Sequence, residues 1–479
     1  MALIWLLMPL ILIFLFKPSS TKNLPPGPRP WPIIGNMMSM LSGALHIKLM
    51  KLARVHGPLM LLKFGSKPVI IVSTQESAME VLRTHDRAFS GRSVPHSLRI
   101  VEHIKHSLVW SDCTDEWKNL RRIAKTELFS TKMLDMHARV RQEKVSEMVD
   151  YIRENEGGPI MITGVVFGTL LNILGHGIFS KDVFQFGGKG DEFRMQKVIR
   201  KMIGLVVEPN LADFYPILGG LDLQGLLREC KTCFDEVIEV WKDTVKERRA
   251  NRDSSKHDVL EVLLDNEFSD AQINAFFLES FGPGSESSST AVEWAMAELL
   301  KHPDKMTKLR DELNREVGPT NLTEAHLPSL RYLQACIKET LRLHPVLPFL
   351  LPHRTVETCQ VMGYTIPKNY ETVINAYAIG RDPNAWTDPD TFWPERFLDT
   401  DVDYSGNHYQ LIPFGAGRRI CPGIPLSNRA IPLLIGSLIH TFDWSLPNGM
   451  KADDLDMTEK MSLTLVINPS LVAVPKVRV

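Results

Sequence analysis

The sequence predicts a mostly α-helical fold with a smaller β part, and three observations lead to this prediction. Helical patterns dominate from about Gln75 to Leu343. A hairpin pattern precedes them, with strands at Leu59–Phe64 and Val69–Val72 on either side of a Gly-Ser-Lys-Pro turn. A second β-leaning region covers Val361–Ala376, and strands are expected over Leu463–Val474 near the C-terminus.

Composition excludes one class of partner. The 479-residue chain has a formal net charge of −1, so it has no overall basic field to attract nucleic acid. Hydrophobic residues make up 44% of the chain, which is ordinary for a globular protein and lets a chain of this length bury a sizeable core. We therefore expect a globular body with no nucleic-acid partner.

The six cysteines are too sparse for a disulfide scaffold at this length. Cys230 and Cys233 form a CxxC pair inside a helical-looking stretch from Leu226 to Arg249, where both thiols share one face. The chain has no second CxxC that would complete a zinc site. We expect two ordinary buried helix cysteines.

The N-terminus carries an uninterrupted apolar run from Ala2 to Phe16, followed by Lys17 and Lys22. Fifteen helical residues reach about 22 Å, short of the roughly 30 Å hydrocarbon core. A cleaved secretory signal is the alternative, but there is no basic n-region and no clear small-x-small cleavage site. The lysines after the run favour a cytosolic location for the rest of the chain. Residues 1–19 are therefore predicted to be a retained signal-anchor helix.

A proline-rich segment comes after the apolar run, with five prolines in the nine residues Leu24–Pro32. Proline lacks an N–H and clashes with the preceding helical turn, so this segment should be extended and stiff. We expect residues 20–35 to form a hinge that holds a folded body, residues 36–479, off a membrane.

The strongest chemical signal is the glycine-rich loop Pro413–Gly423, which delivers one cysteine to the start of a helix. Glycines let the backbone approach a flat ligand and take positive φ. The stretch Ile424–His440 is apolar and helical in pattern, so Cys421 should lie at a helix N-terminus, whose N–H groups favour a thiolate.

This loop fits the pattern F-x-x-G-x-R-x-C-x-G and resembles the haem-binding loop of cytochromes P450. The matching residues are Phe414, Gly417, Arg419, Cys421 and Gly423. The resemblance implies a cytochrome P450 fold with haem b (iron protoporphyrin IX) as cofactor. It also implies that Cys421 is the iron ligand and that Arg419 pairs with a haem propionate. A thiolate axial ligand favours cleavage of the O–O bond.

Further motifs lie in the order that the family has. Glu339 and Arg342 form an ExxR pair on one helix face, and Arg396 lies downstream in a PERF segment; in the family these three residues lock together. Taken alone, ExxR would be an ordinary surface ion pair. Trp117 and Arg121 match the family's WxxxR helix, and His353 falls where plant members place a residue that binds a propionate.

These motifs span about 300 residues, so the resemblance covers essentially the whole chain. It implies one catalytic domain behind the N-terminal membrane anchor. It also implies dioxygen as a substrate, NADPH-cytochrome P450 reductase as the electron-donating partner, and the endoplasmic reticulum membrane as the location, with a single pass and a cytosolic catalytic domain.

The oxygen-activating segment departs from the family pattern. The family has [AG]-G-x-[DE]-T-[TS], and this chain has Pro-Gly-Ser-Glu-Ser-Ser over residues 283–288. Glu286 keeps the acid, and Ser287 keeps a hydroxyl able to relay protons. Pro283 inside a helix costs about 3 kcal/mol and should produce a sharp kink. A neutral variation within the family is the alternative.

Other strings, at residues 106–114, 352–359 and 442–449, resemble a plant alkaloid branch of the family, whose members hydroxylate, couple or rearrange their substrates. The altered segment looks more like that of coupling or rearranging members. A small Ser287 and a kinked Gly282-Pro283-Gly284 would widen the space beside the oxidant. We therefore expect phenol coupling of a benzylisoquinoline such as reticuline. Hydroxylation of a benzylisoquinoline and a carbocation rearrangement are the alternatives.

An alkaloid substrate would be a cationic amine, which a carboxylate or an aromatic face could receive. Glu279 and Glu208 are candidates, although each fits a solvated residue better. A haem protein without catalysis, such as a gas sensor or an electron carrier, is the competing class. It would need neither an acid–hydroxyl pair nor a basic face for a reductase, and substrate-dependent consumption of NADPH discriminates the two.

Overall fold

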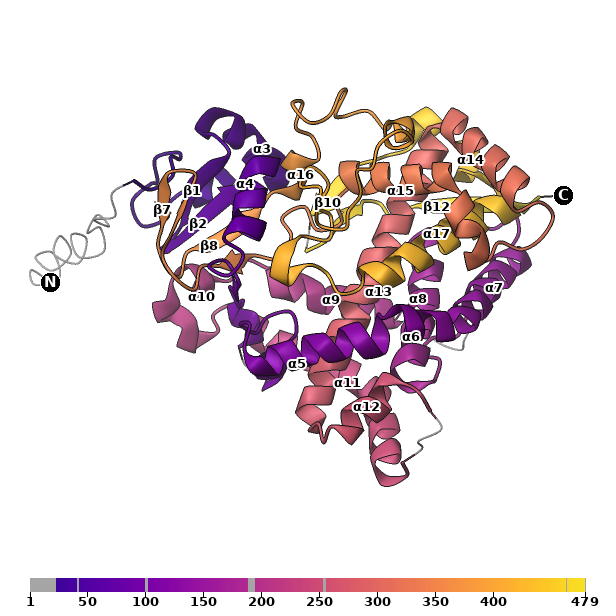
Figure 1. The fold of residues 1–479 in the computed structure, drawn as a ribbon, viewed down its shortest axis with the longest axis horizontal. Coiled ribbons are helices and arrows are strands. Elements are labelled where there is room, and N and C mark those ends of the chain that lie inside the picture. Colours follow the sequence, from indigo (N-terminus) through magenta and orange to yellow (C-terminus); the bar gives the residue numbers. More distant parts are fainter. Residues whose placement is uncertain are drawn as a thin grey trace, which may run out of the picture.

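The structure is a computed structural model and describes residues 23–40, 43–99, 102–187, 194–252, 256–461 and 463–478. The predicted signal-anchor, residues 1–19, lies outside the described residues and stays a prediction. Helices dominate the described chain, and the β part is smaller, with its largest sheet at one side (Figure 1). The helices are α2 (Met37–Met40), α3 (Leu45–His56), α4 (Gln75–Met79), α5 (Asp115–Ile123), α6 (Thr131–Met136), α7 (Ala138–Glu154), α8 (Ile162–Phe179), α9 (Arg194–Val207), α10 (Leu211–Phe214), α11 (Leu226–Ala250), α12 (Val259–Asp265), α13 (Asp270–Lys301), α14 (Pro303–Glu316), α15 (Arg331–Leu343), α16 (Ala376–Ile379) and α17 (Ile424–Thr441).

The largest sheet has the strand order β1-β2-β8-β5-β3. Its first two strands form the predicted hairpin, and β8 then adds parallel to β2, with Val72 opposite Ile374. The sheet lies on the side of Figure 1 where the described chain begins. The strands are β1 (Leu59–Phe64), β2 (Lys67–Val72), β3 (Gly91–Arg92), β4 (Ile160–Met161), β5 (His353–Arg354), β6 (Cys359–Val361), β7 (Tyr364–Ile366), β8 (Glu371–Ile374), β9 (Phe442–Ser445), β10 (Glu459–Met461), β11 (Leu465–Ile467) and β12 (Val472–Val477).

The proline-rich segment contains no helix or strand between residues 24 and 30, as expected, but it is attached to the sheet. The N–H of Leu61 in β1 donates to the Pro26 carbonyl over 2.8 Å. A Cβ at Gly27 would lie 2.0 Å from the Leu61 carbonyl oxygen, so only glycine allows this close approach. The Asn36 side chain accepts from the Lys63 N–H over 2.8 Å. The described part of the predicted hinge is therefore docked along the outer edge of β1.

Helix α13 is the central element of the helical part. It is 32 residues long and begins at a capping box formed by Ser269 and Gln272. It packs along α8, which is apolar on all sides and 94% buried. Within the described residues, α8 is the one helix long and apolar enough to cross a membrane, but its burial identifies it as a core helix.

Two predictions about individual segments are confirmed. Cys230 and Cys233 are free, buried thiols on α11, and burial raises the pKa of Cys230 to about 12. The helix predicted after Gly423 is α17, Ile424–Thr441, which packs against α13 and α15.

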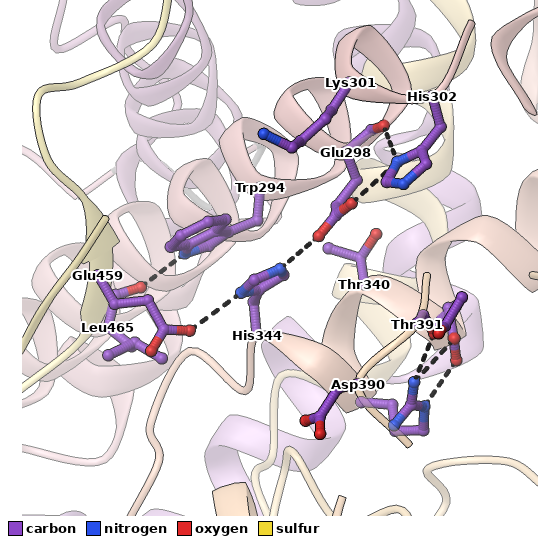
Figure 2. Close-up of polar contacts among 12 residues, drawn as sticks. Trp294, Glu298, Lys301, His302, Thr340, His344, Asp390, Thr391, Glu459 and Leu465 are labelled. Atoms are coloured by element: carbon purple, nitrogen blue, oxygen red, sulfur yellow. Dashed lines mark hydrogen bonds and ion pairs between the residues drawn. The ribbon is translucent and has the colours of Figure 1, made fainter. Parts of the chain in front are cut away.

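A buried polar cluster fixes the C-terminal end of α13. His344, which caps α15, lies between Glu298 of α13 and Glu459 of β10, with N–O distances of 2.6 and 3.3 Å (Figure 2). Its ring stacks on Trp294 with a centroid distance of 3.9 Å. The Trp294 indole N–H donates to the Leu465 carbonyl of β11 over 2.7 Å. The cluster therefore holds the β10–β11 hairpin against α13.

Candidate active site

The glycine-rich loop closes on itself and presents Cys421 at the start of α17. Gly415 and Gly417 have φ of 70° and 67°, which is the left-handed region. A Cβ at Gly417 would lie 2.0 Å from the Leu82 carbonyl oxygen, so this position also needs glycine for space. The Cys421 N–H donates to the Phe414 carbonyl over 3.0 Å and closes the loop. Phe414 and Gly417 therefore shape the loop itself.

The Cys421 sulfur lies among donors. The Gly423 N–H donates to Sγ over 3.4 Å. Burial raises the pKa of the thiol, while this N–H and the Arg121 cation act in the opposite direction. A metal ion bound to Cys421 would favour the thiolate further, because its positive charge acts in the same direction as this N–H and Arg121.

A cationic cluster lies beside this loop. Arg419 donates from Nε to the Ser90 carbonyl over 2.9 Å and from Nη2 to the Ser111 carbonyl. Its buried Nη1 finds no hydrogen-bond partner among the described residues. Burial, then the nearby Arg419 cation, lowers the pKa of buried Arg92 to about 9. This positive charge and the orphaned donor fit an acidic group, such as the propionates of haem.

Trp117 and Arg121 are on α5, one turn apart, and adjoin this cluster. The Arg419 guanidinium lies 4.6 Å from the centre of the Trp117 ring. The Trp117 indole N–H donates to the Leu108 carbonyl over 2.8 Å, and Arg121 donates to the Ile420 carbonyl. In this arrangement the indole N–H serves the neighbouring loop, and the ring is a platform for Arg419.

His353 is a buried residue of β5, close to the same cluster. Its Nδ1 lies 2.8 Å from the Phe89 carbonyl oxygen and donates to it. Burial, followed by the Arg92 cation, lowers the pKa of His353 to about 3, so the ring is neutral. Its Nε2 is then an acceptor, and a contact with a propionate requires that His353 first takes up a proton.

The ExxR prediction is confirmed as a buried lock. Glu339 and Arg342 are joined by two hydrogen bonds of 2.7 and 2.8 Å, and both side chains are fully buried. Arg396 binds the same carboxylate over 3.1 Å. The alternative of a surface ion pair is excluded, because both side chains are buried. A buried carboxylate needs its cationic partners to remain ionised.

The segment with the altered oxygen-activating pattern, residues 283–288, lies inside α13. Helical structure continues through Pro283, so the proline does not end α13; a bend inside it stays a prediction. A Cβ at Gly282 would lie 3.4 Å from Met202 of α9, and one at Gly284 would lie 3.1 Å from Leu174 of α8. At these two positions glycine permits close packing of α13 against α9 and α8. The expectation that this segment widens the space beside the oxidant stays a prediction.

Glu286 and Ser287 are both engaged. Buried Glu286 accepts from Arg200 Nε of α9 over 2.9 and 3.0 Å, and burial raises its pKa. The partly exposed Ser287 hydroxyl donates to the Pro283 carbonyl over 2.7 Å. Arg200 is a partner that the sequence patterns did not indicate, since it lies 86 positions before Glu286.

The two candidates for receiving an amine have opposite environments. Glu208 is exposed, as expected. The expectation of a solvated Glu279 was wrong, because the Leu108 and Val109 N–H groups donate to it over 2.6 and 3.0 Å inside the protein. Burial raises the pKa of Glu279 to about 7.

Partly buried apolar side chains pack against the hydrophobic cluster that contains the N-terminal half of α13. They come from separate segments and are Phe129, Leu108, Val109, Leu351, Leu426 and Leu463. Phe129 also lies within 4.0 Å of the Cβ position of Gly423, beside the Cys421 loop. Apolar walls with a few polar groups are typical of a site for a small organic molecule.

The comparison with protein families identifies the family of the chain. The family model for cytochrome P450 matches residues 25–474. The chain belongs to the cytochrome P450 family. It is therefore a haem-binding oxidoreductase that uses dioxygen and electrons from NADPH. Its relatives include plant alkaloid cytochromes P450, as the sequence motifs predicted.

Three relatives show the branch. The chain is 57% identical to corytuberine synthase of Coptis japonica over 98% of each protein. It is 46% identical to (S)-N-methylcoclaurine 3'-hydroxylase isozyme 1 of Papaver somniferum over 98% of each protein. It is also 46% identical to berbamunine synthase of Berberis stolonifera, over 99% of this chain and 98% of the relative.

Proposed function

We propose that this cytochrome P450 couples phenol rings within a benzylisoquinoline of the reticuline type, as a corytuberine synthase-like enzyme. The observation that carries this proposal is the 57% identity to corytuberine synthase over nearly the full length of both proteins. The Pro283 and Ser287 departure in the distal segment supports a reaction other than simple hydroxylation.

The residues of the site have separable roles in this proposal. Cys421 would ligate the haem iron, and Gly415, Gly417 and Gly423 would let the backbone lie close to the ring. Arg419 would bind a propionate through its orphaned Nη1, with Trp117 and Arg121 supporting it. Protonated His353 would be the second propionate contact. When bound, the haem supplies the oxidising equivalents from dioxygen.

The chain itself would orient the substrate and move protons. The apolar side chains around α13 would hold two phenol rings near each other, which is the main requirement of a coupling reaction. Glu286 and Ser287 would pass protons to the oxygen side, after release of their bonds to Arg200 and Pro283. Coupling removes two hydrogens from the substrate; together with NADPH and one proton, they reduce dioxygen to two waters and leave NADP⁺.

Oxygen-18 labelling tests the reaction type. Phenol coupling gives a product that carries no label from dioxygen, whereas a hydroxylase leaves one labelled oxygen in its product. Labelled product would overturn the coupling proposal and favour the alternative, which the 46% identity to (S)-N-methylcoclaurine 3'-hydroxylase supports. Unlabelled product without a new ring bond would indicate a rearrangement of the littorine mutase type. NADPH consumption that does not depend on substrate would indicate a haem sensor or an electron carrier.

We also propose that the protein is attached to the endoplasmic reticulum membrane by one N-terminal pass, with its folded body in the cytosol. Exposed apolar side chains surround α10 and the start of the described chain, and they are Trp31, Ile33, Ile217, Leu221 and Leu223. The Tyr215 hydroxyl donates to the Ile33 carbonyl over 3.2 Å and joins the two segments. Such a patch fits a membrane surface. Protease added to intact microsomes should digest the body, and full protection would contradict this topology.

A further inference from the structure

The segment Ser107–Ser111, here called the strap, crosses between the distal helix α13 and the cationic cluster. Its N–H groups face Glu279 of α13. Leu108 N and Val109 N donate to Glu279 Oε2 over 2.6 and 3.0 Å, and the Ser107 hydroxyl donates to Oε1. The Trp110 N–H donates to the same hydroxyl oxygen over 2.6 Å. Three consecutive N–H groups therefore depend on one carboxylate, two directly and one through Ser107.

The carbonyl groups of the strap are held from the other side. The Leu108 carbonyl accepts from the Trp117 indole, and the Val109 carbonyl accepts from Arg92 Nε over 3.3 Å. The Ser111 carbonyl accepts from Arg419. The strap is thus fixed along one edge by Glu279 and along the other by the residues that adjoin the Cys421 loop.

The side chains of Leu108 and Val109 belong to the apolar group that the proposed function assigns to the substrate. Leu108 and Val109 pack on the same hydrophobic cluster as Leu351 and Leu463, and each is only partly buried. Because hydrogen bonds fix their backbone on both edges, these two side chains have little freedom to shift. Under the proposed function, their position would set the shape of the substrate space next to α13.

We propose that Glu279 is a positioning residue that holds the 107–111 strap against α13 and thereby fixes the Leu108 and Val109 walls of the substrate site. It acts through the backbone of the strap and does not touch the substrate. Its carboxylate is occupied by three donors, so it is not free to receive an amine while the strap is in place. The substrate consequence rests on the proposed function, whereas the backbone consequence does not.

The chain offers a matched control on the same helix. Glu293 is a fully buried α13 glutamate, whereas Glu279 is partly buried, and burial raises the pKa of each to about 7. Its carboxylate accepts from the Leu471 N–H over 2.8 Å and makes no bond to the strap. Glu293→Gln therefore reports the general effect of neutralising a buried glutamate in α13, and Glu279→Gln reports that effect plus the loss of the strap contacts. Ser107→Ala removes the hydroxyl without changing α13.

Amide hydrogen exchange of the full-length holoenzyme tests the backbone role. We expect Glu279→Gln to accelerate exchange at Leu108 and Val109, because an amide group accepts fewer and weaker hydrogen bonds than a carboxylate. Ser107→Ala should accelerate exchange at Trp110, and Glu293→Gln should leave the strap as in the wild type. Wild-type exchange in Glu279→Gln, or equal acceleration in Glu293→Gln, would overturn the proposal.

Ligand binding tests the consequence for the site. Spectral titrations would use reticuline, a cationic amine, and its N-acetyl analogue, which has the same rings but no charge. In Glu279→Gln we expect both dissociation constants to rise about tenfold, with a smaller change in kcat. Weaker binding of reticuline alone, with unchanged strap exchange, would mean that Glu279 receives the amine and would overturn the proposal. A wild-type enzyme that binds neither ligand would reject the substrate class, and the exchange comparison would still decide the role of Glu279.

Discussion

The two ends of α13 each bury glutamates, but they stabilise them in opposite ways. At the C-terminal end, burial alone would raise the pKa of Glu298, yet hydrogen bonds from His302 and His344 outweigh it and bring the pKa down to about 2. In the first half, Glu279 has neutral donors in direct contact and its pKa is raised to about 7. The contrast shows that burial does not decide the charge of a carboxylate; its partners do.

The two parts of α13 differ in role: the C-terminal end joins elements of the fold, and the half near Pro283 lies at the candidate site. The C-terminal end joins α13, α15 and the β10–β11 hairpin through charges that are balanced within the fold. The half near Pro283 faces the site and holds carboxylates whose ionised form is costly. Perturbed carboxylates of this kind are more common at functional sites than in structural cores.

The largest expected effect comes from breaking the C-terminal cluster. His344→Leu leaves Glu298 and Glu459 buried with one cationic partner fewer, so the free energy of unfolding should fall by about 3–5 kcal/mol. His302→Gln is the control, because the half-buried His302 ring contacts the same Glu298 but is more exposed to solvent than His344. Urea unfolding of the full-length protein in detergent measures both. Equal losses of unfolding free energy in the two variants would show that His344 contributes no more to stability than His302.

A smaller effect is expected at the other half of the helix. Arg200→Gln removes the cation beside Glu286, and the pKa of Glu286, already raised by burial, should rise further. The carboxyl then takes up a proton, which limits the loss of stability to about 1–3 kcal/mol. Lys201→Gln on the same helix, which breaks an exposed pair with Glu229, should change stability less than Arg200→Gln does. A larger loss from the Lys201 variant would contradict this order.

The pH dependence of stability should separate the two ends. The folded pKa of Glu298 is below its ordinary value of 4.5, so its contribution is present above pH 4.5 and is lost as pH falls toward 2. The folded pKa of Glu279 is above 4.5, so the folded state binds more protons and stability falls as pH rises from 4.5 to about 7.

Unfolding curves of two variants at several pH values check these windows. Glu298→Gln should flatten the dependence below pH 4.5, and Glu279→Gln should flatten it between pH 4.5 and 7. If both variants alter the same window, the two ends of α13 do not differ in the way that their contacts indicate.

The smallest structural change is expected at Ser287. Ser287→Thr keeps the hydroxyl and should retain product formation, whereas Ser287→Ala should form more peroxide and less product for each NADPH consumed. Neither variant should alter stability by more than about 1 kcal/mol, because the hydroxyl bonds only to the Pro283 carbonyl of its own helix. An unchanged yield of product for each NADPH in Ser287→Ala would show that Ser287 does not take part in proton transfer.

The sequence was informative where a residue type and a fixed spacing together determine the geometry. Glu339 and Arg342 share a helix face by spacing alone, and the structure joins them with Arg396 in a buried lock. The glycines around Cys421 predicted a tight loop, and Gly417 lies against the Leu82 carbonyl. The hairpin and the helix after Gly423 were predicted within about two residues at each end.

Sequence reasoning was weaker where distant segments meet. Nothing in the spacing of Arg200 links it to Glu286, and nothing local shows that Glu279 is covered by residues 107–109. The spacing of Gly282 and Gly284 did not indicate that they lie against Met202 of α9 and Leu174 of α8. Such contacts depend on how helices pack, and a local pattern does not contain that information.

The attachment of residues 24–36 to β1 has a practical consequence. β1 is the outermost strand of its sheet, and the N–H groups of Leu61 and Lys63 are covered by the Pro26 carbonyl and the Asn36 side chain. Removing this segment would expose an unpaired strand edge, on which a second chain can add as a further strand and start aggregation. A shortened, detergent-free form of the enzyme should therefore keep every residue from Asn23 onward, and the proline-rich segment protects solubility as much as it links two parts of the chain.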